Sequence, residues 1–137
     1  MLRVLFLCTG NSARSQIAEA ILKHIGGEGF DVHSAGTKLQ SEVNPFAIEV
    51  LIERGVLIEN LYPKHVNEFV NQEFDLVVTV CDGAKQSCPF FPGARQMEHW
   101  SLEDPAVFQG TYNEILLTFR ETRDEIEKRI RERILKS

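Results

Sequence analysis

A short apolar run at the start of the chain leads directly into a loop and then into a helical pattern. The run covers Leu2 to Leu7, the loop covers Cys8 to Arg14, and the helical pattern opens at Ser15. A run of this length without strict polar alternation is typical of a strand that is covered on both faces. A buried strand followed at once by a helix predicts an α/β fold on a parallel sheet.

Strands and helices alternate along the rest of the chain. Strands are predicted over Leu2 to Leu7, Phe30 to Ala35, Phe74 to Val80 and, with a weaker pattern, Arg95 to Trp100. Helices are predicted over Ser15 to Ile25, from the cap Asn44 to the stop at Gly55, over His65 to Val70, and over Thr111 to Lys136. The order predicts a four-stranded parallel sheet with helices on both faces. At 137 residues, the chain forms one domain, residues 1–137.

Local signals support two of these helices. The first helix closes at Gly26 and Gly27, where glycine permits a left-handed cap. In the last helix, acidic residues precede basic ones by four positions, which predicts ion pairs on a solvated face. The pairs are Asp124 with Lys128, Glu125 with Arg129 and Glu127 with Arg131.

Charge and composition exclude several function classes. Fifteen Lys and Arg against 20 Asp and Glu leave a net charge of -5, which argues against nucleic-acid binding. The apolar runs are too short for a membrane span, and the first lies too close to Met1 for a signal peptide. Three cysteines fit catalytic or redox thiols better than a disulfide framework. We therefore expect a cytoplasmic protein.

The loop after the first strand has the composition of an oxyanion site. Backbone amides at a helix N-terminus bind tetrahedral anions, and an arginine grips two anion oxygens in a planar fork. The same positive field favours the thiolate, so Cys8 is a candidate nucleophile. The expected oxyanion-binding residues are Thr9, Gly10, Asn11, Ser12, Ala13, Arg14 and Ser15. Ser15 either caps the helix or donates its hydroxyl to the thiolate; the alternative to the whole site is an inert, buried Cys8.

Three residues farther along the chain are candidates for the same chemistry. Cys81 and Cys88 follow the third strand, and a helical spacing would separate their Cα atoms by roughly 10 Å, beyond the reach of a disulfide. A bond between them requires an unwound, mobile segment, which Gly83 and the stretch 89–93 favour; two unrelated thiols are the alternative. Asp104, before Pro105, is a candidate general acid or base. We expect no metal site.

These motifs, taken in order, resemble those of one enzyme family. They are Cys8-x5-Arg14-Ser15, Ser34-Ala35-Gly36-Thr37, Val80-Cys81-Asp82-Gly83-Ala84, Cys88-Pro89 and Asp104-Pro105. Together they resemble the arsenate reductases of the low-molecular-weight tyrosine phosphatase fold, over nearly the whole chain. The loop and Asp104 would be shared with the phosphatases, whereas the pair of Cys81 and Cys88 is similar to the reductases alone.

The resemblance implies a reaction and its partners. Arsenate would bind the Cys8 loop with phosphate as a competitor, and Cys81 would attack the Cys8 sulfur to expel arsenite. Cys88 would then attack Cys81 and leave a disulfide that thioredoxin or a glutaredoxin-type reductant reduces. Asp104 would handle protons as oxygen leaves arsenic. No cofactor is expected, and the expected state is a monomer.

The resemblance also raises the question of a bound cation. Certain members carry a potassium site made by a loop asparagine, a helix glutamate, a serine and an aspartate. Asn11, Glu19 and Ser34 match the first three, but the aspartate position falls near Pro63 and Lys64. The expectation is that the Lys64 ammonium takes the place of potassium.

Two other functions stay open on the sequence. A phosphatase of the same fold would hydrolyse phosphomonoesters through a Cys8 cysteinyl-phosphate, with Cys81 and Cys88 dispensable. A noncatalytic oxyanion-binding or redox-sensing protein would bind phosphate without turnover.

Overall fold

The sheet is formed by parallel strands in the order β2-β1-β3-β4. The computed structural model describes residues 1–80 and 90–136, and within them the sheet has four strands. They are β1 (Leu2–Cys8), β2 (Phe30–Gly36), β3 (Leu76–Thr79) and β4 (Met97–His99). All the pairings are parallel, with Leu2 beside Phe30 and Cys8 beside Gly36 along the central pair. The predicted four-stranded parallel sheet is confirmed.

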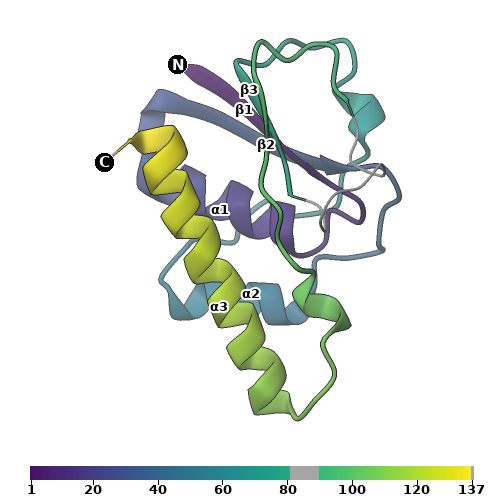
Figure 1. The fold of residues 1–137 in the computed structure, drawn as a ribbon, viewed down its shortest axis with the longest axis vertical. Coiled ribbons are helices and arrows are strands. Elements are labelled where there is room, and N and C mark those ends of the chain that lie inside the picture. The colour runs from purple at the N-terminus through teal and green to yellow at the C-terminus, as the bar shows by residue number, and fades with distance from the viewer. Residues whose placement is uncertain (81–89, 137) are drawn as a thin grey trace.

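In the part of the chain that the structure describes, three α-helices cover one face of the sheet. They are α1 (Arg14–Gly26), α2 (Pro45–Glu53) and α3 (Tyr112–Ile130), which a π-helical turn extends over Arg131–Leu135. Figure 1 shows them together on one side, with the short helix η2 (Val66–Glu68) on the other. None of the helices in the described residues is long and apolar enough to cross a membrane.

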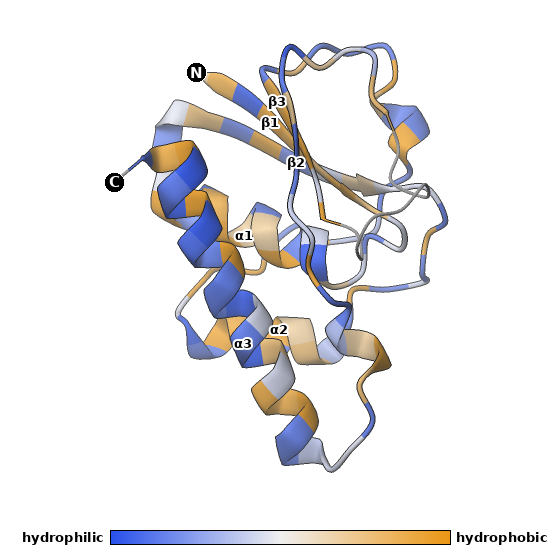
Figure 2. Ribbon diagram, viewed as in Figure 1, coloured by the Kyte–Doolittle hydropathy of each residue, from blue (hydrophilic) through white to orange (hydrophobic). Residues whose placement is uncertain are grey.

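Each face of the sheet has its own apolar core. On the helix side, Phe6 and Val78 of the strands pack with Ile17 of α1 and Phe119 of α3. On the other side, the core consists of buried residues from the strands and the loops: Leu5, Leu7, Ala35, Phe69, Phe74, Val77 and Phe91. Hydrophobic residues follow the strands and alternate with hydrophilic ones along α3 (Figure 2). Burial on both faces explains why the two central strands, β1 and β3, are mainly apolar in sequence.

The helix ends follow the sequence signals. Asn44 caps α2 by accepting a hydrogen bond from the Phe46 amide. Thr111 and Glu114 form a capping box at the start of α3. Gly27 ends α1 with a φ of 67°, in the left-handed region that glycine enters without steric cost.

The helix predicted over His65 to Val70 is wrong in extent. Only η2 forms there, a single 3-10 turn after His65, whose Nδ1 accepts from the Asn67 amide. A six-residue segment gains too few hydrogen bonds to offset helix nucleation. Instead, Phe69 turns into the apolar core and ends the turn.

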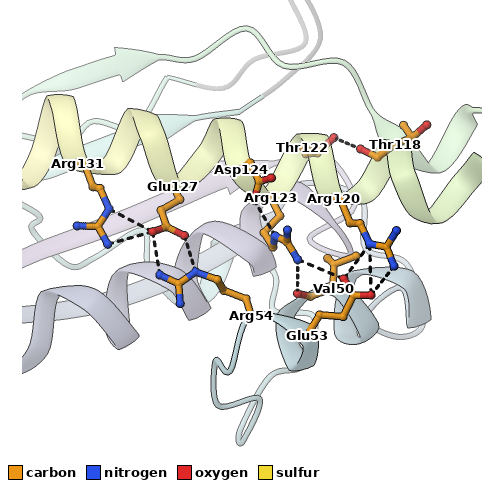
Figure 3. A network of polar contacts seen from close by, with 10 residues as sticks. All are labelled: Val50, Glu53, Arg54, Thr118, Arg120, Thr122, Arg123, Asp124, Glu127 and Arg131. Atoms are coloured by element: carbon orange, nitrogen blue, oxygen red, sulfur yellow. Dashed lines mark hydrogen bonds and ion pairs between the residues drawn. The ribbon is translucent and has the colours of Figure 1, made fainter.

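The charges of α3 do more than face solvent. Glu125 pairs with Arg129 and Glu127 with Arg131, as predicted, but Glu127 also accepts from Nε and Nη2 of Arg54 at the end of α2. Arg120 and Arg123 of α3 both contact Glu53 of α2 (Figure 3). Asp124 contacts its neighbour Arg123. This face therefore joins α2 to α3, which corrects the prediction of a merely solvated face.

Glu127 is expected to stabilise the fold only when it is ionised. Hydrogen bonds from Arg54 hold the pKa of this carboxyl below its usual 4.5. A lowered pKa contributes stability that is present above the unfolded value and is lost as the pH falls through the folded value. We expect Glu127→Gln to lower the free energy of unfolding by about 1–3 kcal/mol at pH 7 and by clearly less at pH 4. Urea unfolding at both pH values tests this; an equal loss at both would contradict it, and Glu121→Gln, on the exposed face of α3, is the control.

Candidate active site

The candidate site lies where the carboxyl ends of the strands meet. Cys8 is the last residue of β1, and the loop 9–13 connects it to α1. A cavity of about 370 Å³ opens above the loop. It is lined by the loop itself and by residues from two distant segments: Cys8, Thr9, Gly10, Asn11, Ser12, Ala13, Arg14, Gln40, Asn44, Asp104, Ala106 and Val107. Ligands of open α/β sheets bind at this edge.

The carbonyls of the loop are held on its outer side. Those of Thr9, Gly10 and Ser12 accept hydrogen bonds from the segment that follows β2, at 2.8–3.1 Å. The Asn11 carbonyl accepts from Gln16 Nε2. Because a trans peptide points its N–H away from its C=O, carbonyls held outward turn the amides toward the cavity. The loop thus presents N–H groups at the N-terminus of α1, as an anion site requires.

The Cys8 sulfur lies at the floor of this cavity. It is buried and accepts a hydrogen bond from the Asn11 amide at 3.2 Å. The Ser15 hydroxyl contacts it at 2.8 Å. Ser15 does not cap α1, because the cap position is Ala13. Of the two roles considered for Ser15, the structure therefore has the hydroxyl on the sulfur.

Hydrogen bonds of the Asn11 side chain hold the loop in place. It is fully buried and has a φ of 52°, a left-handed conformation that asparagine tolerates. Its Oδ1 accepts from the Lys64 amide at 2.7 Å, and since a backbone N–H only donates, the NH₂ of Asn11 must lie on the opposite side. That NH₂ donates to Ser15 Oγ at 2.8 Å and to Ser34 Oγ at 3.0 Å. The orientation of the amide is thereby determined.

Arg14 and Asp104 meet at the edge of the cavity, although 90 positions separate them. Arg14 is buried, and its Nη1 donates to the Leu102 carbonyl at 2.8 Å. Its Nη2 lies 3.7 Å from Asp104 Oδ2. The other oxygen, Oδ1, accepts from the Ala106 amide and caps the short helix η3 (Pro105–Val107). Asp104 thus has one oxygen held by the fold and one facing the cation that would bind substrate.

A buried ion pair lies beneath the loop. Glu19 Oε1 accepts from the Ser34 hydroxyl at 2.5 Å and lies 3.4 Å from Lys64 Nζ. The oxygens that would bind potassium, on Asn11, Glu19 and Ser34, all accept from N–H, O–H or ammonium donors. These residues do not fit a potassium ion. Within residues 1–80 and 90–136, no group of three or more His, Cys, Asp or Glu side chains gathers to hold a metal.

A thiol over a ring of amides, with an arginine and a carboxylate beside it, is a known arrangement for binding and attacking tetrahedral anions. The model of the low molecular weight phosphotyrosine protein phosphatase family matches residues 3–136. The chain belongs to this family. Within this family, three similar proteins are all described as arsenate reductases.

An arsenate reductase of Oceanobacillus iheyensis is 42% identical over 128 residues, which are 93% of this chain and 91% of the relative. A solved structure described as an arsenate reductase in the phosphate binding state superposes with a TM-score of 0.83 at 31% identity, covering 99% of this chain and 98% of the other. The solved structure of the thioredoxin-dependent arsenate reductase of Corynebacterium glutamicum superposes with a TM-score of 0.67 at 36% identity. The match covers 96% of this chain and 62% of the other. The resemblance inferred from the sequence motifs is confirmed.

The structure brings together most of the residues predicted for the site in this family member. The loop residues 9–13, Cys8, Arg14 and Asp104 line one cavity, and Ser15 lies behind it. Cys81 and Cys88 lie outside the described residues, so their predicted roles stay predictions.

Five residues at the site were not predicted from the sequence: Gln16 and the cavity residues Gln40, Asn44, Ala106 and Val107. Gln16 is fully buried on α1, and its Nε2 donates to Asn11 and to the Tyr62 carbonyl. A glutamine between Ser15 and Ile17, at the start of an apolar helix, was the available signal. Gln40 and Asn44 reach the cavity from the loop between β2 and α2, and only the tertiary structure shows this.

Gly36 is expected to be essential for the shape of the loop. A Cβ at this position would lie 2.5 Å from the Thr9 carbonyl oxygen and 3.0 Å from the Asn11 nitrogen. Because both contacts are to backbone, the loop itself must move. We expect Gly36→Ala to destabilise the fold by about 1–3 kcal/mol and to weaken phosphate binding. Urea unfolding and phosphate titration test this, with Gly29→Ala, whose Cβ meets nothing within 4 Å, as the neutral control.

Proposed function

We propose that this protein is an arsenate reductase that works through a thiol relay of Cys8, Cys81 and Cys88. One observation carries the proposal: Cys8, the loop amides, Arg14 and Asp104 line a single cavity. The relatives at about 40% identity that are named arsenate reductases support the same reaction.

Binding comes first. Arsenate is a tetrahedral dianion of the size and shape of phosphate, and the loop amides with the Arg14 fork match its oxygens. The dipole of α1 adds a favourable field at the same point. Because the loop recognises shape and charge, phosphate competes for it.

The chemistry then moves two electrons from sulfur to arsenic. The Cys8 thiolate attacks arsenic(V) and forms an S–As bond while an oxygen leaves as water, protonated by Asp104. The Cys81 thiolate attacks the Cys8 sulfur, an S–S bond forms and the S–As bond breaks. The electron pair of that bond stays on arsenic, which departs as arsenite.

The last steps restore the site. The Cys88 thiolate attacks Cys81, which frees Cys8 and leaves a disulfide between Cys81 and Cys88. A thioredoxin or a glutaredoxin-type protein reduces this disulfide, a role favoured by the thioredoxin-dependent neighbour among solved structures. The cycle needs thiols that start reduced, so the cytoplasm is the proposed compartment.

The first experiment is a single turnover without external reductant. One equivalent of arsenate is added to the reduced protein, arsenite is quantified and the thiols are mapped by mass spectrometry. We expect one arsenite per chain and a disulfide between Cys81 and Cys88. Three free thiols with unchanged arsenate would refute the reductase.

The relay predicts a different stall for each cysteine. Cys81→Ser is expected to stop before arsenite is released, because no thiolate attacks Cys8. Cys88→Ser is expected to release one arsenite and to accumulate a disulfide between Cys8 and Cys81. Both variants should lose at least about 10³-fold in steady-state turnover. Full turnover by either variant would exclude the relay, and mass spectrometry of the trapped species identifies the stall.

A phosphatase is the second candidate, because the family as a whole carries that description. The same cavity would hold a phosphomonoester, and Asp104 would protonate its leaving group. Brisk hydrolysis of an aryl phosphate by a variant that lacks both Cys81 and Cys88, with no arsenite formed by the wild type, would favour it.

A further inference from the structure

Lys64 is a buried cation that the proposed chemistry does not use. Only 6% of the residue is exposed, although Tyr62, two positions earlier, is on the surface. Its Nζ lies 2.7 Å from the Tyr62 carbonyl, 4.6 Å from the centre of the Tyr62 ring and 3.4 Å from Glu19 Oε1. A lysine is rarely buried unless its charge is paired, and here Glu19 supplies the opposite charge. A buried ion pair this close to the loop is a candidate for a role in the site.

The hydrogen bonds that lead from this pair toward the sulfur run in one direction. Ser34 accepts from the Asn11 NH₂, so its own hydroxyl hydrogen is available for Glu19 Oε1. Ser15 also accepts from the Asn11 NH₂, which leaves its hydroxyl hydrogen for the sulfur 2.8 Å away. Glu19 Oε1 holds the Ser34 hydroxyl in this order as long as it acts as an acceptor, and a buried carboxylate keeps that role when a cation compensates its charge.

We propose that Lys64 is a positioning residue: through Glu19, its ammonium maintains the hydrogen bonds that stabilise the Cys8 thiolate. This chain therefore carries on a side chain the cation that compensates the buried Glu19 carboxylate. The inference rests on the proposed function only in taking Cys8 as the nucleophile. It adds a residue to the site that touches neither substrate nor sulfur.

The charges around Lys64 come from two elements. Glu19 and Lys23 lie on α1, and Glu68 lies on η2. Burial lowers the pKa of the Lys64 ammonium, and Glu19 opposes that shift. Lys23 binds the other carboxylate oxygen, Oε2, at 2.6 Å, but its side chain is 45% exposed. Solvent screens an exposed charge, so Lys64 is the partner that matters.

The test measures the reactivity of Cys8 alone. In a background with both Cys81 and Cys88 replaced by serine, the rate of iodoacetamide alkylation is followed from pH 5 to pH 9. We expect Lys64→Met to slow alkylation at pH 7 about tenfold and to move the pH profile upward. Lys64→Arg should stay within about threefold, because it keeps the charge.

Lys23→Met is the matched control, since it removes the other cation that contacts Glu19. We expect it to change the alkylation rate less than about twofold. An effect as large as that of Lys64→Met would overturn the proposal, as would a Lys64→Arg variant as slow as Lys64→Met. Where Lys64→Met does not fold, Lys64→Gln takes its place, because its amide donates to Glu19 without a charge.

A double-mutant cycle tests whether the effect passes through Glu19. In a Glu19→Gln background there is no carboxylate to compensate, so Lys64→Met should change the rate less than about twofold. The same tenfold loss in both backgrounds would show that Lys64 acts by another route. Exchanging sodium for potassium at constant ionic strength should leave the wild-type rate unchanged; a clear acceleration by potassium would contradict the built-in cation.

The outcomes separate this inference from the proposed function. If wild-type Cys8 reacts no faster than an ordinary cysteine thiol at pH 7, the nucleophile itself is refuted. If Cys8 is alkylated rapidly in the wild type and equally rapidly in the Lys64→Met variant, only the proposed role of Lys64 is refuted.

Discussion

Replacing Cys8 by serine is expected to abolish arsenate reduction, with a loss of at least about 10⁴-fold. A hydroxyl stays protonated in the field that favours a thiolate, and oxygen cannot form the disulfide on which arsenite release depends. The variant should fold, because serine is smaller and the Ser15 hydroxyl 2.8 Å away can still form a hydrogen bond with it. Arsenite released in a single turnover is the measurement.

Anion binding is the control for Cys8→Ser. The loop amides and Arg14 are unchanged, so the affinity for phosphate by calorimetry should stay within about threefold of the wild type. Residual turnover with intact binding would place the nucleophile on another residue. Loss of binding together with turnover would mean that the substitution disturbs the loop.

The second large effect is expected for Asp104→Asn. Asparagine keeps the Oδ1 acceptor that caps η3, so the loop position is retained, but it removes the proton that the carboxyl supplies as oxygen leaves arsenic. General acid catalysis contributes about 10²–10⁴-fold, and we expect a loss of turnover in that range. The rate of arsenite formation under saturating arsenate measures it.

Glu103→Gln is the matched control for Asp104→Asn. Glu103 is the preceding residue, is exposed and does not line the cavity. Its replacement should leave turnover within about twofold. Equal losses in the two variants would indicate a general charge effect at the mouth of the site, and no loss in Asp104→Asn would remove Asp104 from the mechanism.

Much of the fold could be predicted because its signals are local. The buried strand β1 reads as an uninterrupted apolar run, and Asn44 with Pro45 marks the start of α2 by the chemistry of caps. The helix predicted over His65 to Val70 was wrong because this segment has only a weak helix preference, and packing of Phe69 into the apolar core outweighed it. The role of the charged face of α3 was also missed, since its partners Glu53 and Arg54 lie more than 60 positions away.

The candidate site likewise combines a local feature, which the sequence predicts, with contacts between distant segments, which it does not. The sequence by itself determined the anion loop, because seven consecutive residues between a strand and a helix carry the nucleophile, the amides and Arg14. Only the tertiary structure decided that Asp104 faces Arg14 and that Gln40 reaches the cavity. It also places the Lys64 ammonium against Glu19, as the resemblance to the family implied. The reason is physical: a loop is specified by its own backbone geometry, whereas contacts between distant segments depend on how the sheet and helices pack.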